Sequence, residues 1–179
     1  MRKIDYSYKE MEKEMKEKIA NLCVEGERAQ RGVLATSAND FVTARKMGFI
    51  PDGLKLYGWT NRTSRKHQQI MANPNVSVVV DFVQIEGIAN LKRHPMDEPE
   101  FLELYKKNLP DDYERSIKDW RESDQLVIEV VPKRIALYDV KGDENGAYLD
   151  ILNIDKGTAF RFYDHKVWSE NEDTKAYWE

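Results

Sequence analysis

Residues 60–80 read TNRTSRKHQQIMANPNVSVVV, and this stretch shapes the interpretation of the whole chain. Ser64 is a typical helix N-cap, and Asn73-Pro74 is a typical helix end one short helix later. Four basic residues nevertheless crowd the start of this helix: Arg62, Arg65, Lys66 and His67. Cations are unfavourable there, because a helix N-terminus already carries about half a positive charge. No acidic residue stands in the first turn, so a bound anion is the candidate partner of these cations.

The residues around this helix start suit a phosphate group. Free backbone N–H groups, the hydroxyls of Thr60, Thr63 and Ser64, and the side chains of Arg65 and Lys66 can converge on one anion. Arg45-Lys46, in the preceding strand, would approach the same point if the two strands pair across a hairpin at Pro51-Asp52-Gly53. The alternative, which the sequence leaves open, is that these cations are solvated surface charges that pair with nearby acids.

The segments that flank this stretch alternate between helical and β patterns. An amphipathic helix is expected around Tyr8, Met11, Met15, Ile19 and Leu22, ending near Gly26. Strands are expected at 32–38, 40–50, 54–61, 76–83 and 84–92, with turns at Asn39-Asp40 and Pro51-Asp52-Gly53. Two helical pieces follow, centred on Phe101–Tyr105 and Tyr113–Trp120 and separated by Pro110. Later strands are expected at 125–132, 134–140, 147–152 and 158–168.

This order of elements predicts a mainly β (α+β) fold. Strands joined by short turns favour an antiparallel sheet, and closure into a small barrel removes the exposed edges. The apolar run VSVVV indicates a strand covered on both faces, by the barrel interior and by a helix or a partner. The chain is expected to form one domain over 1–179. It divides into an N-terminal helix (1–26), a barrel core (30–140) with a helical insertion (97–121), and a C-terminal extension (141–179).

The composition limits the possible functions. The chain has 179 residues, 41% of them hydrophobic, and a net charge of −4, which argues against a general nucleic-acid coat. The single cysteine, Cys23, falls in an apolar helical pattern and is expected to be a buried, inert thiol in a reducing compartment. We find no signal-peptide run and no apolar stretch long enough to span a bilayer, so a cytoplasmic protein with no membrane partner is expected.

Other familiar sites lack support in the sequence. There is no G-x-G-x-x-G and no Walker A motif, and the three histidines (His67, His94 and His165) are far apart, so no metal site is expected. Ser64 has no His and acid partners nearby in the sequence, and no side chain is nominated as catalytic.

The run TNRTSRKHQQIMANPNVS resembles the flavin-phosphate segment of the pyridoxamine 5'-phosphate oxidase-like, FMN-binding split-barrel superfamily. The flanking GVLATS, TARKM, IEGIA and VIEVVPKRIALYD follow the family order, so the resemblance spans roughly residues 30–140. It implies a six-stranded antiparallel split β-barrel with flanking helices, usually a homodimer with FMN at the interface.

The resemblance also implies roles for individual residues. Arg45, Arg65 and Lys66 would bind the FMN phosphate with help from Ser64. Lys46 and Met47 would lie along the isoalloxazine ring, and Trp59 and Thr60 match an aromatic-Thr pair that contacts the flavin through backbone and hydroxyl. The C-terminal tail does not match the Trp- and Arg-rich ending of true pyridoxamine phosphate oxidases. That activity is therefore disfavoured, and the general stress protein, flavin-nucleotide-binding branch is expected.

The function expected from this resemblance is an FMN-dependent oxidoreductase. A reduced nicotinamide (NAD(P)H) would be the electron donor, and the acceptor is open. One alternative is a flavin-binding or flavin-buffering stress protein without turnover of its own. Another is the same fold with a deazaflavin or haem in its pocket, because a fold does not fix a function.

Overall fold

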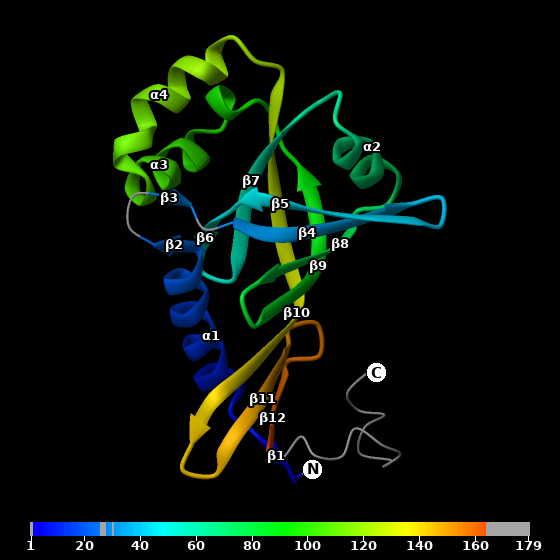
Figure 1. Cartoon of the computed structure of the whole chain (residues 1–179), viewed down its shortest axis with the longest axis vertical. Helices are drawn as coiled ribbons and strands as arrows, with labels where there is room; N and C mark the ends of the chain where they lie inside the picture. The colour runs from blue at the N-terminus through cyan, green and yellow to red at the C-terminus, as the bar shows by residue number, and fades with distance from the viewer. Residues whose placement is uncertain (1, 26–27, 30, 164–179) are drawn as a thin grey trace.

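The computed structural model describes residues 2–25, 28–29 and 31–163 (Figure 1). Its helices are α1 (Tyr8–Cys23), α2 (Arg65–Ala72), α3 (Pro99–Asn108) and α4 (Pro110–Arg121), with a 3-10 turn, η1, at Pro95–Asp97. The strands are β1 (Arg2–Asp5), β2 (Val24–Glu25), β3 (Arg28–Ala29), β4 (Arg31–Ala38), β5 (Phe41–Gly48), β6 (Ile50–Asp52), β7 (Lys55–Asn61), β8 (Asn75–Val80), β9 (Val83–Leu91), β10 (Gln125–Asp143), β11 (Gly146–Asn153) and β12 (Thr158–Tyr163).

The central feature is a split β-barrel. Its strands pair in the order β5-β4-β8-β9-β10-β7-β6, and every pairing is antiparallel. β5 and β6 follow one another along the chain with Phe49 between them, yet they pair at opposite ends of this order. Phe49 is fully buried at this break. One stretch of chain therefore supplies both edges of the barrel part of the sheet. The predicted antiparallel split barrel with flanking helices is confirmed, with the three-residue β6 as a seventh strand beside the six expected.

Two turns of the barrel depend on residues that tolerate a left-handed backbone. Asn39 and Asp40 have φ of 49° and 60°, which fits the predicted two-residue turn between β4 and β5. The β8–β9 turn lies at Asp81-Phe82, where Asp81 has φ of 51°. The sequence predicts one strand through 76–83, and this prediction is wrong because an Asp in the left-handed region can end a strand without a glycine.

The predicted pairing of the Arg45 strand with the strand before α2 was also wrong. β5 pairs with β4, whereas β7 pairs with β6 and β10. Pro51 and Asp52 belong to β6, and the hairpin turn is formed by Gly53, with φ of 60°, and Leu54. The buried bend at Phe49 redirects the chain, so β5 and the hairpin lie on different parts of the barrel.

The side chains of strand β8 alternate between buried and exposed positions, so the strand is not covered on both faces. Val76, Val78 and Val80 point into the core, whereas Val79 is 39% exposed on the outer face. The expectation of burial on both faces is therefore wrong for the isolated chain. Cover by a second chain stays a prediction.

The helices follow their apolar patterns. Met11, Met15 and Ile19 of α1 are buried in the main core, as the sequence predicted. The two predicted helical pieces are α3 and α4, and Pro110 begins α4, where its missing N–H is not needed. Trp120 of α4 lies in a second core with Phe101 and Tyr105 of α3. Figure 1 shows α3 and α4 on one side of the barrel and α2 on the other.

Strand β10 connects the barrel to a second part of the sheet. Its first half pairs with β7 and β9, and its second half continues to β11, then β12 and β1, at the far end of the molecule (Figure 1). The two predicted strands at 125–132 and 134–140 are one strand with an irregularity between Pro132 and Arg134. The sequence did not predict β1, β2 or β3. Across the described residues, no helix has the length and apolar character needed to cross a membrane.

Some expectations fall outside the described part of the chain. These are the helix end at Gly26, the burial of the Cys23 side chain, the position of His165, and the last part of the strand predicted at 158–168. The described strand β12 ends at Tyr163.

Candidate anion-binding site

The start of α2 has the predicted geometry. Ser64 is the N-cap, in an extended conformation, and its Oγ accepts a hydrogen bond from the His67 backbone N–H at 3.2 Å. The Thr60 hydroxyl lies 2.7 Å from Ser64 Oγ, so β7 and the helix cap are tied together. The first turn holds no acid, which leaves the partial positive charge of the helix without an acidic residue beside it.

Arg45 reaches this helix from β5 by crossing β4. Its Nη1 donates to the Leu34 carbonyl oxygen at 3.1 Å and to Thr36 Oγ1 at 2.7 Å. Its Nη2 donates to Thr43 Oγ1 and, at 3.2 Å, to Oε1 of Gln69 on α2. Both terminal nitrogens therefore already have two acceptors each. Arg45 approaches the helix as expected, but through Gln69 and not through a β5–β7 pairing.

The cations at this site repel one another. Burial, and then the nearby charge of Arg65, lowers the pKa of Arg45. Burial, and then the charge of Arg45, lowers the pKa of Lys66. Among the described residues, no acid forms an ion pair with Arg45, Arg65 or Lys66. The open alternative, in which these cations pair with neighbouring acids, therefore has no support within the described chain.

Two of these cations remain available to an anion. Arg65 is exposed, with its guanidinium 5.5 Å from the centre of the Phe41 ring, and Lys66 is half-buried. The backbone N–H groups of the first helical turn have no acceptor within the helix and point out of its N-terminus, where helices commonly bind anions. Arg45 has its Nε–H and its charge left to contribute, because its terminal nitrogens are committed to protein acceptors.

The remaining candidate residues are spread over two faces. Lys46 is exposed on one face of β5, and Met47 points to the opposite face. The Met47 methyl group lies so close to Gly58 that a Cβ added at Gly58 would be 2.6 Å from it. Thr60 is buried beside Ser64, whereas the side chain of its neighbour Trp59 packs among aromatic rings of α3 and α4. The structure thus brings Arg45, Thr60, Ser64, Arg65 and Lys66 together, and the binding role of each candidate stays a prediction.

The sequence interpretation missed Gln69, which organises the site. Gln69 is 6% exposed, and its Oε1 accepts from Thr36 at 2.7 Å and Thr43 at 2.6 Å as well as from Arg45. Its Nε2 donates to the Phe41 carbonyl oxygen at 3.1 Å. The signal was present in the sequence as a polar residue on the buried face of a short amphipathic helix. Such a residue must find polar partners.

Known proteins share the sequence pattern and the fold of this chain. A sequence profile for the family described as pyridoxamine 5'-phosphate oxidase matches residues 11–139. The crystal structure of General Stress Protein 26 from Bacillus anthracis str. Sterne is 29% identical, with a TM-score of 0.51 over 68% of this chain and 91% of that one. No curated protein sequence matches the chain significantly.

Two more distant structures share the fold. A pyridoxamine 5'-phosphate oxidase-related, FMN-binding protein from Nostoc punctiforme PCC 73102 is 12% identical, with a TM-score of 0.53 over 87% of this chain and 95% of that one. A heme-binding protein from Mycobacterium smegmatis is 13% identical, with a TM-score of 0.54 over 70% of this chain and 53% of that one. The profile match covers well over half of the 179 residues, and the chain therefore belongs to the pyridoxamine 5'-phosphate oxidase family.

Proposed function

We propose that this protein is an FMN-dependent oxidoreductase that passes electrons from a reduced nicotinamide nucleotide to an acceptor. The observation that carries the proposal is the group of mutually repelling cations, without an acidic partner in the described chain, at the start of α2. Membership of the family supports it, as does the shared fold of an FMN-binding protein.

The residues at the helix start fit the phosphate of FMN. Lys66, Arg65 and the free N–H groups of the first turn would hold the phosphate, and the Ser64 and Thr60 hydroxyls would complete its surroundings. Burial, and then repulsion from Arg45, lowers the pKa of Lys66. A bound anion would offset both effects, so binding of the cofactor and ionisation of Lys66 support each other. When bound, the flavin accepts electrons from a donor and passes them on. The protein contributes anchoring and orientation.

Titration of two flavins tests this proposal. Riboflavin lacks the phosphate of FMN, so FMN is expected to bind at least about a hundredfold more tightly, given several charge-assisted contacts reduced by partial exposure. Lys66→Ala and Arg65→Ala should each weaken FMN and leave riboflavin nearly unchanged in a fluorescence-quenching titration. Lys107→Ala, at an exposed position on α3, is the matched control. Equal losses for both flavins would contradict the assignment of the phosphate site.

A second candidate function is a flavin-binding stress protein without turnover. The similarity to General Stress Protein 26 favours it. Steady-state oxidation of NADH or NADPH with an added electron acceptor separates the two functions, because only the enzyme sustains turnover. The visible spectrum of the purified protein separates FMN from a deazaflavin or haem.

A further inference from the structure

The two ends of the helical insertion meet at His94. The insertion consists of η1, α3 and α4 and lies between β9 and β10, so η1 begins it and α4 ends it. His94 is half-buried and is the N-cap residue of η1. Its ring also reaches the last turn of α4, where it lies beside the carbonyl oxygen of Trp120. One side chain therefore contacts both ends of the insertion.

The contacts of the His94 ring select one protonation state. Nδ1 accepts a hydrogen bond from the Met96 backbone N–H at 3.2 Å, and Nε2 lies 3.0 Å from the Trp120 carbonyl oxygen. A backbone N–H only donates and a carbonyl oxygen only accepts, so Nδ1 must be bare and Nε2 must carry the hydrogen. The neutral ring with its hydrogen on Nε2 is the form that makes both bonds.

At the η1 end, the ring supports a short turn. The backbone hydrogen bonds of η1 run from the Asp97 N–H to the His94 carbonyl oxygen at 2.8 Å and from the Glu98 N–H to the Pro95 carbonyl oxygen at 3.2 Å. The bond from Met96 to the His94 ring adds to them. A turn of three residues has few such bonds, so the loss of one weakens it markedly.

At the α4 end, the backbone has other partners. The Trp120 carbonyl oxygen also accepts from the Ser123 backbone N–H at 2.9 Å and from the Ser123 hydroxyl at 3.0 Å. A protonated His94 ring would keep its Nε2–H, and it would lie at a helix C-terminus, which favours a positive charge. The contact between the ring and α4 therefore survives protonation.

Protonation acts at the η1 end instead. It places a hydrogen on Nδ1, which would then face the Met96 N–H, and two donors cannot bond to one another. The N-cap bond is lost in this form. Histidine is the side chain whose ordinary change of charge falls between pH 5 and 8, so mild acid is enough to bring the change about.

The charged side chains nearby do not hold the ring in either form through an ion pair. They are Arg93, Asp97 and Glu98 beside η1, and Arg121, Glu122 and Asp124 beside the end of α4. Arg93 pairs with Glu98 at 3.0 Å, and within the described chain none of the six forms an ion pair with His94. Four of them are acids, so a positive ring meets no net repulsion here. The bond to Met96 is the contact that distinguishes the two forms of the ring.

We propose that His94 is a pH-sensitive clasp of the helical insertion. Its neutral ring holds η1 against the end of α4, and protonation in mild acid releases η1 while the ring stays on α4. Met96 packs against the second core beside Trp120, so its release loosens the insertion where it joins β9. The clasp is independent of the flavin proposal.

NMR of the full chain without flavin tests the clasp. At about pH 7.5 the ring nitrogen shifts of His94 should show the hydrogen on Nε2. Between about pH 7.5 and pH 5.5 the Met96 amide proton should move upfield, because its hydrogen bond is lost. The midpoint of this movement should equal the midpoint of the His94 ring signals.

Two variants assign the transition to one ring. In His94→Asn, the side-chain oxygen is a good N-cap acceptor and does not titrate, so the Met96 amide should keep one shift at both pH values. His67→Asn removes a half-buried histidine at the start of α2 and should retain the Met96 transition.

Three results would overturn the proposal. They are a hydrogen on Nδ1 of His94 at about pH 7.5, a Met96 amide that does not move with the His94 ring, and a Met96 transition that survives in His94→Asn. If His94→Asn folds poorly, the ring tautomer and the shared midpoint in the wild type still decide the question.

Discussion

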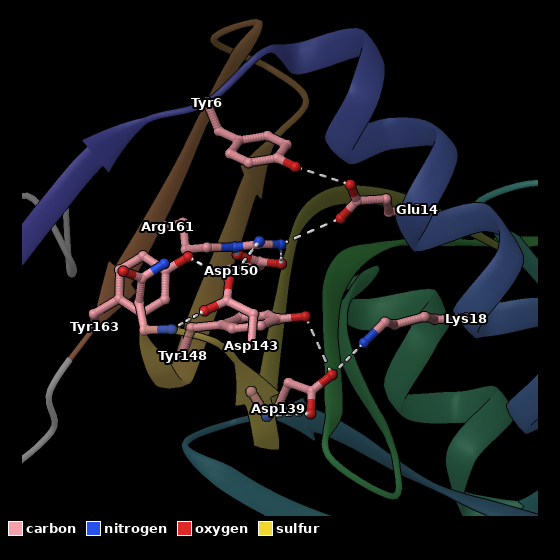
Figure 2. A network of polar contacts seen from close by, with 11 residues as sticks. Tyr6, Glu14, Lys18, Asp139, Asp143, Tyr148, Asp150, Arg161 and Tyr163 are labelled. Carbon is pink, nitrogen blue, oxygen red and sulfur yellow. Dashed lines mark hydrogen bonds and ion pairs between the residues drawn. The ribbon is translucent and has the colours of Figure 1, made fainter.

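Arg161 and Asp150 form a two-point ion pair in the sheet beyond the barrel (Figure 2). Arg161 Nε lies 2.6 Å from Asp150 Oδ1, and Nη2 lies 2.7 Å from Oδ2. The guanidinium lies 3.8 Å from the centre of the Tyr148 ring, and Nη2 also reaches Glu14 of α1 at 3.2 Å. The pair therefore joins β11 and β12 and links both strands to the first helix.

Removing the charge of Asp150 should destabilise the protein strongly. Asp150 is 1% exposed and Arg161 is 8% exposed, so Asp150→Asn leaves a buried guanidinium without its main partner. We expect a loss of about 3 kcal/mol in the free energy of unfolding, at the low end for a broken buried pair because Glu14 and Asp143 remain near Arg161. Urea denaturation followed by circular dichroism measures this loss.

Asp155→Asn is the control for this experiment. Asp155 pairs with Lys133 at 3.2 Å, and both side chains are more than half exposed. The expected change is within about 0.5 kcal/mol, as for most surface substitutions. Similar urea midpoints for the two variants would mean that the buried pair does not stabilise the sheet.

Glu129 should make the barrel sensitive to acid. Burial favours a raised pKa, but hydrogen bonds from Lys55, Asn90 and Tyr57 outweigh it and lower the pKa of Glu129 to about 2, from an ordinary 4.5. A lowered folded-state pKa gives stability that is complete above the unfolded pKa and is lost as the pH falls through the folded one. The wild type should therefore lose this contribution between about pH 4.5 and pH 2.

Glu129→Gln tests the acid dependence. We expect it to be less stable at pH 7 by about 2 kcal/mol, because charge-assisted hydrogen bonds are lost, and to lose less further stability in acid. Urea midpoints at pH 7, 5, 4 and 3 give the slopes to compare. Glu103→Gln, at an exposed position on α3, should follow the wild type. Parallel wild-type and Glu129→Gln curves would show that Glu129 does not titrate in this range.

Gln69 should support both the fold and the cofactor site. In Gln69→Leu, Arg45 and two threonine hydroxyls lose a shared acceptor, and the Phe41 carbonyl oxygen loses a donor. We expect a loss of about 2–3 kcal/mol in stability, since these groups are left partly unsatisfied. Both flavins should bind more weakly, because the change displaces α2 and does not remove a phosphate contact. Gln68→Leu, at the exposed neighbouring position, should change neither stability nor binding.

Local patterns predicted most elements of the barrel. Met11, Met15 and Ile19 marked α1 by their spacing, and Asn39-Asp40 marked a hairpin, because both signals depend on residues close in sequence. The break at Phe49 could not be predicted in the same way. An apolar residue between two strand-forming stretches reads as a continuous strand, and only the closure of the barrel requires a bend there.

Only the local part of the candidate site could be predicted from the sequence. Ser64, Arg65 and Lys66 belong to one helix start, so a local argument about charge and capping identifies them. Gln69 joins three elements through side-chain contacts, and the aromatic cluster around Trp59 needs α3 and α4 to fold back onto β7. Such long-range arrangements leave only a weak signal in a single sequence.

The outer face of β5, β4 and β8 should mediate a homodimer. Val42 is 67% exposed and Val79 39% exposed, and Ala35 of β4 lies between their strands on the same face. Exposed apolar groups that continue across three strands are typical of an interface. A stable dimer buries about 800 Å² on each partner. Light scattering at micromolar concentration should therefore return twice the mass of the 21.0 kDa chain.

Val79→Glu tests this interface against a matched control. A carboxylate on the β8 side of this apolar face would have to be buried without a partner, so the variant should dissociate to monomers at concentrations where the wild type remains a dimer. Val140→Glu places the same charge at a 51% exposed valine on the second half of β10, away from the barrel face, and should stay dimeric. If the cofactor lies between the two chains, Val79→Glu should also bind FMN more weakly while Val140→Glu binds it normally. A Val79→Glu variant that remains dimeric would place the interface on another surface, and a wild-type monomer with FMN bound would exclude the shared site.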